Sequence, residues 1–174
     1  MKIGLYVLSI LCFVLLSCGD DKSTDEVVEE QKTNQEPVIT EKAIEKFKYK
    51  DYALSSESED AIAEWENYQE LAIQISYLKK ADLSFFNGDK EELKEFIMDF
   101  KTATPKEFLT NPIKSRTAII ETMLLKLNEN LTLDNIEKKD KLLSVKEVLI
   151  AFSNLNYQIN KKLEYDYYNK IKAE

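Results

Sequence analysis

Residues 142–163 read LLSVKEVLIAFSNLNYQINKKL, a stretch in which apolar side chains recur every three or four positions. The recurring apolar residues are Leu142, Val145, Leu149, Phe152, Leu155, Ile159 and Leu163. This spacing is typical of an amphipathic helix that packs one face against a core. Asp134 and Glu137 precede the stretch and are spaced as a capping box, so we expect the helix to begin there.

Three earlier segments have the same helical spacing. The first follows Ser56, ends at Asn87-Gly88, and contains the apolar residues Ile62, Trp65, Tyr68, Ala72, Ile75 and Leu78. The second begins at Asp89, with Glu92 three residues on, and contains Leu93, Phe96, Ile97 and Phe100. The third begins at Asn111-Pro112 and contains Ile113, Ile120, Leu124 and Leu127. A single turn through Phe108 and Leu109 is expected between the second and third helices.

These patterns predict an all-α fold, because no segment after the first eighteen residues has the spacing of a β-strand. The first and fourth helices are each expected to span about 30 residues, or roughly 45 Å at 1.5 Å per residue. Short connections favour antiparallel neighbours, so we expect a four-helix bundle. The alternative is a long two-helix hairpin with the two shorter helices packed at one end.

The beginning of the chain has a different pattern. Lys2 precedes an apolar run from Ile3 to Leu16, which is shorter than the ~20 residues of a membrane-spanning helix. The run ends in Leu15-Leu16-Ser17-Cys18, and polar residues follow. This arrangement resembles the signal peptide and lipobox of bacterial lipoproteins. The resemblance implies cleavage after residue 17 and attachment of lipid to Cys18.

The residues after Cys18 indicate a destination. Gly19 stands where an aspartate often marks retention in the inner membrane, so the resemblance implies the outer membrane. Asp20-Asp21 resembles a short acidic signal that sends some lipoproteins to the cell surface; otherwise it simply begins an acidic tether. The expected location is therefore the outer membrane, on its periplasmic face or at the cell surface.

Residues 18–56 are polar and acidic, so we expect a lipidated cysteine followed by a flexible tether, between a signal peptide at 1–17 and a helical domain at 57–174. One part of the tether is different. Phe47, Tyr49 and Tyr52 stand among lysines, which predicts either an extended arm docked on the bundle or a strand that binds a partner.

Composition excludes several classes of function. The 174-residue chain has no histidine, and its two cysteines are Cys12 in the signal and Cys18. Zinc sites of Cys and His, thiol catalysis and the di-iron Glu-x-x-His pattern are therefore excluded in the helical domain. The net charge of -8 disfavours nucleic acid as a partner. No phosphate-binding or nucleophile motif is present, so we expect no catalysis, no cofactor and no metal.

Arg116 is the only arginine in the chain and lies one turn before Ile120. Its guanidinium is suited to bidentate pairing with a carboxylate, and Asp82 and Asp99 are the expected partners. The structural interpretation is an ion pair that fixes the register of the helices. The functional alternative is a cleft in which Arg116 binds an anion.

Tyrosines gather near the end of the chain. Tyr157, Tyr165, Tyr167 and Tyr168 predict either packing at the end of the bundle or an aromatic rim for a protein or glycan partner. Trp65, by contrast, falls in the apolar pattern of the first helix, and we expect it in the core.

The sequence thus predicts a membrane-anchored envelope lipoprotein, held by lipid on Cys18, whose helical domain binds a protein or another envelope component. The first alternative is a chaperone-like or small-ligand-binding bundle with an apolar groove. Leu143, Val148 and Ile150 favour a groove because they lie off the main apolar face of the fourth helix. The second alternative is an enzyme that uses Asp82, Asp99 or glutamates with a bound cation.

Overall fold

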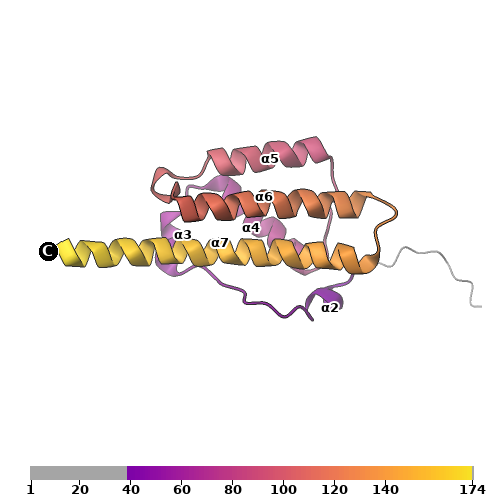
Figure 1. Ribbon diagram of the computed structural model, residues 1–174, viewed down its shortest axis with the longest axis horizontal. Helices are drawn as coiled ribbons and strands as arrows, with labels where there is room; N and C mark the ends of the chain where they lie inside the picture. The colour runs from indigo at the N-terminus through magenta and orange to yellow at the C-terminus, as the bar shows by residue number, and fades with distance from the viewer. Residues whose placement is uncertain (1–38, 174) are drawn as a thin grey trace, which may run out of the picture. The chain divides into compact units, whose positions relative to one another are not determined.

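The computed structural model describes residues 39–173, and this part of the chain is helical with no strand. Its elements are α2 (Glu41–Ile44), α3 (Ser56–Ala61), α4 (Glu66–Lys79), α5 (Lys90–Thr102), the 3-10 turn η1 (Lys106–Phe108), α6 (Asn111–Thr132) and α7 (Lys138–Ala173) (Figure 1). The lipobox, Leu15 to Cys18, lies outside the described residues. The prediction of an all-α fold is confirmed.

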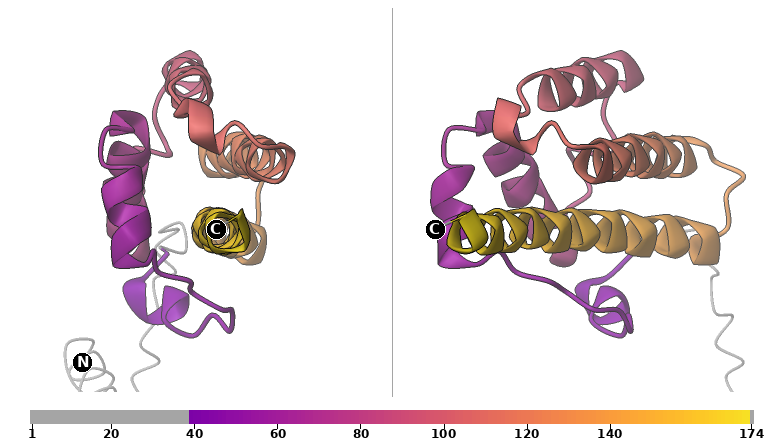
Figure 2. Two further views of the ribbon diagram at one scale, coloured as in Figure 1. Left: turned by 90° about the vertical axis from the view of Figure 1, so that its left-hand side faces the viewer. Right: turned by 60° about the vertical axis from the view of Figure 1, so that its left-hand side comes forward.

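Four helices form the bundle. The long helices α6 and α7 run side by side in opposite directions, and α5 packs on α6 (Figure 1). Helix α4 packs on α5. It also contacts α7, where Tyr68 of α4 stacks on Phe152 with ring centroids 5.4 Å apart. The view turned by 90° separates α4 from the other three helices (Figure 2). The arrangement agrees with the predicted four-helix bundle.

The predicted boundaries of the last three helices agree closely with the structure. The Asp89 carboxylate accepts hydrogen bonds from the amides of Glu91 (2.7 Å) and Glu92 (3.1 Å), which caps α5. Pro112 lies in the first turn of α6, where its missing N–H costs no hydrogen bond. Helix α7 has 36 residues, which makes it the longest element of the described chain.

The first helix was expected to be continuous from Ser56 to Asn87, and this expectation is wrong. The chain instead forms the six-residue α3 and the 14-residue α4. Between them, Trp65 has φ −83° and ψ 76°, outside the helical region. Ile62 and Trp65 are both fully buried, so the break allows two large side chains to reach the core together.

The end of α4 also comes earlier than expected. Ala81 has a left-handed φ of 64°, and its amide donates to the carbonyl of Leu78 (3.0 Å). The next amide, that of Asp82, donates to the carbonyl of Tyr77 (3.0 Å). These two bonds form a Schellman motif, which ends the helix at a residue other than glycine.

The core lies among α4, α5, α6 and α7 and contains mostly the apolar residues predicted for it. Trp65 is confirmed as a core residue: its indole N–H donates to the carbonyl of Phe100 (3.1 Å), and its ring stacks on the Phe100 ring at 5.0 Å. Phe86 and Phe108 are also fully buried. Every deeply buried polar side-chain atom in the described chain has a hydrogen-bond partner, so the core carries no uncompensated polar group.

Within residues 39–173, no helix combines the length and apolar character needed to cross a membrane.

Candidate functional site

An extended arm, residues 46–55, crosses α7 and is held there by three polar side chains. Ser153, Asn156 and Asn160 lie three and four residues apart, on one side of α7, and we call them the clasp. They make five hydrogen bonds with the main chain of the arm. These bonds join Tyr52 N to Ser153 Oγ (2.7 Å), Ser153 Oγ to Lys50 O (2.8 Å), Asn156 Nδ2 to Tyr52 O (2.9 Å), Asn160 Nδ2 to Ala53 O (2.9 Å) and Ser55 N to Asn160 Oδ1 (3.0 Å). The clasp therefore provides hydrogen-bond partners for main-chain N–H and C=O groups of a segment that has no neighbouring strand.

The arm contributes side chains as well as backbone. Phe47 and Tyr49 pack partly buried against the core, and Asp51 forms an ion pair with Lys79 of α4 (2.6 Å). Of the two alternatives predicted for this segment, the structure shows the extended arm docked on the bundle. The packed unit thus includes residues from Ile39 onward, whereas the sequence suggested a flexible tether as far as residue 56.

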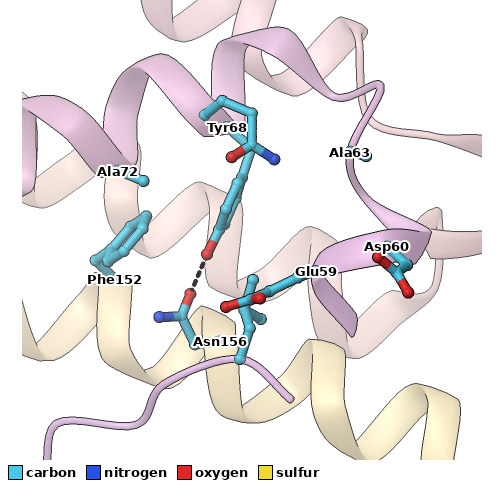
Figure 3. A pocket seen from close by; sticks show the side chains of 9 residues that line it. Glu59, Asp60, Ala63, Tyr68, Ala72, Phe152 and Asn156 are labelled. Atoms are coloured by element: carbon cyan, nitrogen blue, oxygen red, sulfur yellow. Dashed lines mark hydrogen bonds between the residues drawn. The ribbon is translucent and has the colours of Figure 1, made fainter. Parts of the chain in front are cut away.

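A pocket of about 480 Å³ opens between α3, α4 and α7, beside the arm. In Figure 3, Tyr68 extends from α4 toward Asn156 of α7, with Glu59 and Asp60 of α3 nearby. The Tyr68 hydroxyl donates a hydrogen bond of 2.6 Å to Asn156 Oδ1. Phe152 closes one side of the pocket by stacking on Tyr68.

The buried polar side chains of this pocket, Tyr68 and Asn156, are hydrogen-bonded to each other, whereas Glu59 and Asp60 are exposed at its edge. Burial raises the pKa of Tyr68, and the negative charge of Glu59 raises it further, so the hydroxyl stays protonated. Asn156 uses its oxygen for Tyr68 and its nitrogen for the arm. The pocket therefore holds the arm, α4 and α7 together, and its buried polar side chains supply no unpaired base or nucleophile.

Exposed tyrosines gather along the second half of α7. We define the tyrosine surface as Tyr157, Lys161, Tyr165, Tyr168 and Ile171. The exposed fraction is 38% for Tyr157, 66% for Tyr165, 56% for Tyr168 and 51% for Ile171. Large aromatic and apolar side chains that remain this exposed on one helix face are typical of a binding surface.

The arm extends the tyrosine surface sideways. The Tyr52 ring packs against the Tyr157 ring with centroids 4.7 Å apart. The Lys161 ammonium lies 5.9 Å from the centre of the Tyr157 ring, and Lys50 lies 5.6 Å from that of Tyr52. Aromatic rings with adjacent cations are suited to contact another protein or the hydroxylated rings of a glycan.

A second pocket, of about 750 Å³, lies between α3 and the last turns of α7. Its walls include Glu57, Leu163, Glu164, Asp166 and Tyr167. Asp166 pairs with Lys162 and Glu164 pairs with Lys161, so both acids already have cationic partners. This pocket borders the tyrosine surface, and its lining combines apolar surface from Ala61, Leu163 and Tyr167 with charged side chains at its edge.

The ion pair predicted for Arg116 is not formed, and that prediction is wrong. Asp82 instead accepts hydrogen bonds from the amide (3.0 Å) and hydroxyl (2.6 Å) of Ser84, in the turn that follows α4. These bonds also hold the pKa of the Asp82 carboxyl below its usual range. Asp99 is exposed on α5, and Arg116 is half-buried on α6 with no ion pair to any residue in the described range.

No metal site is formed by the described residues, among which no three acidic, histidine or cysteine side chains converge. No family model, curated protein or solved structure matches this chain.

The clasp was missed by the sequence analysis, although the sequence contains a signal for it. Ser153, Asn156 and Asn160 recur at helical spacing beside the apolar face of this stretch. Buried polar residues on one helix face require partners, and the segment that supplies them is about 100 residues earlier in the chain. Only the folded structure shows which backbone they bind.

Proposed function

We propose that this protein is a lipid-anchored lipoprotein of the bacterial outer membrane, and that its helical unit binds another macromolecule without catalysing a reaction. The observation that carries the proposal is the sequence Leu15-Leu16-Ser17-Cys18 at the end of a short apolar run. Two or three acyl chains on Cys18 would anchor the protein durably, because a single chain binds membranes only marginally.

The tyrosine surface supports the binding role. Tyrosine is enriched in protein interfaces because its ring buries a large area while its hydroxyl still forms hydrogen bonds. The buried polar side-chain atoms of the described residues, by contrast, all have hydrogen-bond partners within the fold. A non-enzymatic interaction module is therefore the function that the site supports best.

The anchor is tested by replacing Cys18 with alanine in the full-length protein. We expect the C18A variant to lose incorporation of labelled fatty acid and to accumulate as a precursor or in the soluble fraction. Cys12→Ala is the matched control, since Cys12 lies inside the apolar run and should be dispensable for processing. Unchanged labelling and fractionation of C18A would refute the lipid anchor.

The binding role is tested in intact cells with a photo-crosslinking residue at Tyr165. We expect it to crosslink to one stoichiometric partner, whereas the same residue at Tyr77, an exposed tyrosine of α4, should not. The Tyr77 probe controls for non-specific contact with an exposed aromatic position. Equal crosslinking at the two positions would argue against a dedicated surface on α7.

The alternative of an apolar groove along α7 has weaker support. Leu143 is exposed and Ile150 is half-buried, but Val148 is buried and α2 packs against α7. Binding of an environment-sensitive apolar dye by the folded protein would favour this alternative.

A further inference from the structure

We infer that the pocket between α3, α4 and α7 binds an aliphatic ammonium group, such as that of a lysine side chain or of a small diamine. This pocket shares no lining residue with the tyrosine surface, so the inference goes beyond the proposed function.

The charge of the pocket is negative and uncompensated. Among the described residues that line it, only Glu59 and Asp60 of α3 are charged, and both are exposed at its edge. Neither carboxylate forms an ion pair within residues 39–173, whereas Glu164 and Asp166 of the larger pocket are both paired with lysines. A cleft lined by charges of one sign concentrates its field on a ligand of the opposite sign. The pocket therefore favours a cation.

The buried floor of the pocket can accept a further hydrogen bond. Tyr68 and Asn156 are only 3% and 7% exposed, and the Tyr68 hydroxyl uses its one hydrogen on Asn156 Oδ1 (2.6 Å). The Tyr68 oxygen keeps a lone pair that no hydrogen bond among the described residues uses. An ammonium group has three N–H donors and no acceptor, so it matches this oxygen and the two carboxylates.

Glu59 and the Tyr68 hydroxyl lie close enough to share one ammonium group. In Figure 3 the Glu59 carboxylate points toward the Tyr68 hydroxyl, and its negative charge is one cause of the raised pKa of Tyr68. An ammonium group placed between them forms one neutral and one charge-assisted hydrogen bond. Asp60, the next residue of α3, adds its charge at the edge of the pocket.

The walls of the pocket suit an alkyl chain. Leu54, Ala72 and Phe152 supply apolar surface, and the Phe152 ring stacks on that of Tyr68. The methylene groups of a lysine-type chain bury against such surface while the ammonium stays with polar groups. The volume of about 480 Å³ lies within the ~300–1,000 Å³ of small-ligand sites.

A metal ion fits the pocket less well than an organic cation. Calcium takes about six to eight oxygen ligands, and carboxylates usually supply several of them. Among the described residues, no three acidic side chains converge, and the walls of this pocket are partly apolar. An ammonium group on an alkyl chain uses both the charge and the apolar surface.

The test is an NMR titration of the full-length protein in detergent micelles at low ionic strength. The probe is 1,4-diaminobutane, and the control is 1,4-butanediol, which has the same carbon chain without the charges. We expect the diamine to shift the backbone amides of the pocket residues Ala63 and Gln69, and the diol to leave them unchanged. Equal shifts with the two probes, or no shift at these amides, would overturn the inference.

Variants without the carboxylates test the position of the site. Glu59→Gln should weaken diamine binding about threefold and the double variant E59Q/D60N about tenfold, since exposed ion pairs contribute modestly. Both residues are exposed, so we expect these variants to fold. Glu64→Gln is the matched control, because Glu64 is an exposed acid between α3 and α4 that does not line the pocket. Equal weakening by E59Q and E64Q would show that the diamine follows the overall charge and would overturn the site.

A blocked lysine, Nα-acetyl-lysine methylamide, distinguishes the two sources of the ammonium group. If it binds at least as tightly as the diamine, the occupant is a lysine side chain of a partner protein. If it binds more weakly, the occupant is a free diamine. Absence of binding by both probes would overturn the inference, while the crosslinking test at Tyr165 would still decide the proposed function separately.

Discussion

Ala81 adopts a backbone conformation that is unfavourable for a residue with a side chain. Its φ of 64° places it in the left-handed region, which costs an L-residue other than glycine about 1–2 kcal/mol. Glycine adopts this conformation freely but loses more entropy on folding, so only part of that cost is recovered. We expect Ala81→Gly to raise the free energy of unfolding by about 0.5–1 kcal/mol in urea denaturation.

The matched control for this substitution is Ala103→Gly at the C-cap of α5. Ala103 has a φ of −76°, where glycine relieves no strain and only adds entropy to the unfolded chain. We expect A103G to destabilise the protein slightly. If both variants shift the urea midpoint in the same direction, the strain at Ala81 is not relieved by glycine.

Tyr68 couples the stability of the protein to alkaline pH. Burial raises the pKa of Tyr68 above its ordinary value of about 10, so the unfolded chain releases this proton at lower pH than the folded chain. The folded state then binds more protons, and the free energy of unfolding falls as the pH rises above 10. Tyr49, whose pKa burial and Asp51 raise to about 12, acts in the same direction.

We expect Tyr68→Phe to weaken this alkaline loss of stability, as measured by urea unfolding at a series of pH values. At neutral pH the same variant should be less stable by about 1–2 kcal/mol, because Asn156 Oδ1 loses its buried donor. Tyr77→Phe, at an exposed tyrosine, should change neither quantity. An alkaline profile of Y68F identical to that of the wild type would contradict the role of Tyr68.

Among the elements, the arm depends on the clasp for its order. Asn160→Ala removes two hydrogen bonds, to Ala53 O and from Ser55 N, each contributing about 1 kcal/mol. We expect the Ser55 amide to exchange its hydrogen at least about fivefold faster in this variant, while the amides within α7 keep their protection.

Asn154→Ala is the control for the clasp, since Asn154 is half-buried on α7 but makes no side-chain hydrogen bond with the described residues. Its exchange at Ser55 should match that of the wild type. Equal acceleration in both variants would mean that the arm responds to the general stability of α7 and not to the clasp.

The elements also differ in how well the sequence predicted them. Helices α5, α6 and α7 have local start signals, namely Asp89, Pro112 and Glu137, and their apolar spacing continues without a break. The break between α3 and α4 has no such signal, because no glycine or proline lies between Ile62 and Trp65. It results from tertiary packing, since Ile62 and Trp65 are both fully buried.

The same distinction applies to the candidate site. The tyrosines of α7 were predicted either to form an exposed rim or to pack at the end of the bundle. Only the structure shows that they are exposed, because the spacing of apolar residues does not reveal where the neighbouring helices end. The Arg116 ion pair failed for a related reason: a charge on a helix face does not specify which carboxylate lies opposite. Contacts between distant segments, such as Asn156 with Tyr52, depend on the whole fold.

At the scale of the whole molecule, α7 has a first part that packs in the core and a last part that carries most of the tyrosine surface. Ile159 is fully buried and Leu163 is half-buried, whereas Tyr165, Tyr167 and Tyr168 are all more than half exposed. The first part of the helix therefore packs in the core, whereas its last turns are largely exposed to solvent.

Truncation separates these two parts. Ending the chain after Leu163 removes only turns with little cover, so we expect the free energy of unfolding to stay within about 1 kcal/mol of the wild type. Ending it after Gln158 also removes Ile159, worth about 1.5–3 kcal/mol in burial, together with the hydrogen bonds of Asn160, so we expect a loss of several kcal/mol. Trp65, the only tryptophan of the chain, lies fully buried in the core, and its fluorescence during urea unfolding measures both variants. A large destabilisation by the shorter deletion would show that the last turns of α7 support the fold and are not reserved for a partner.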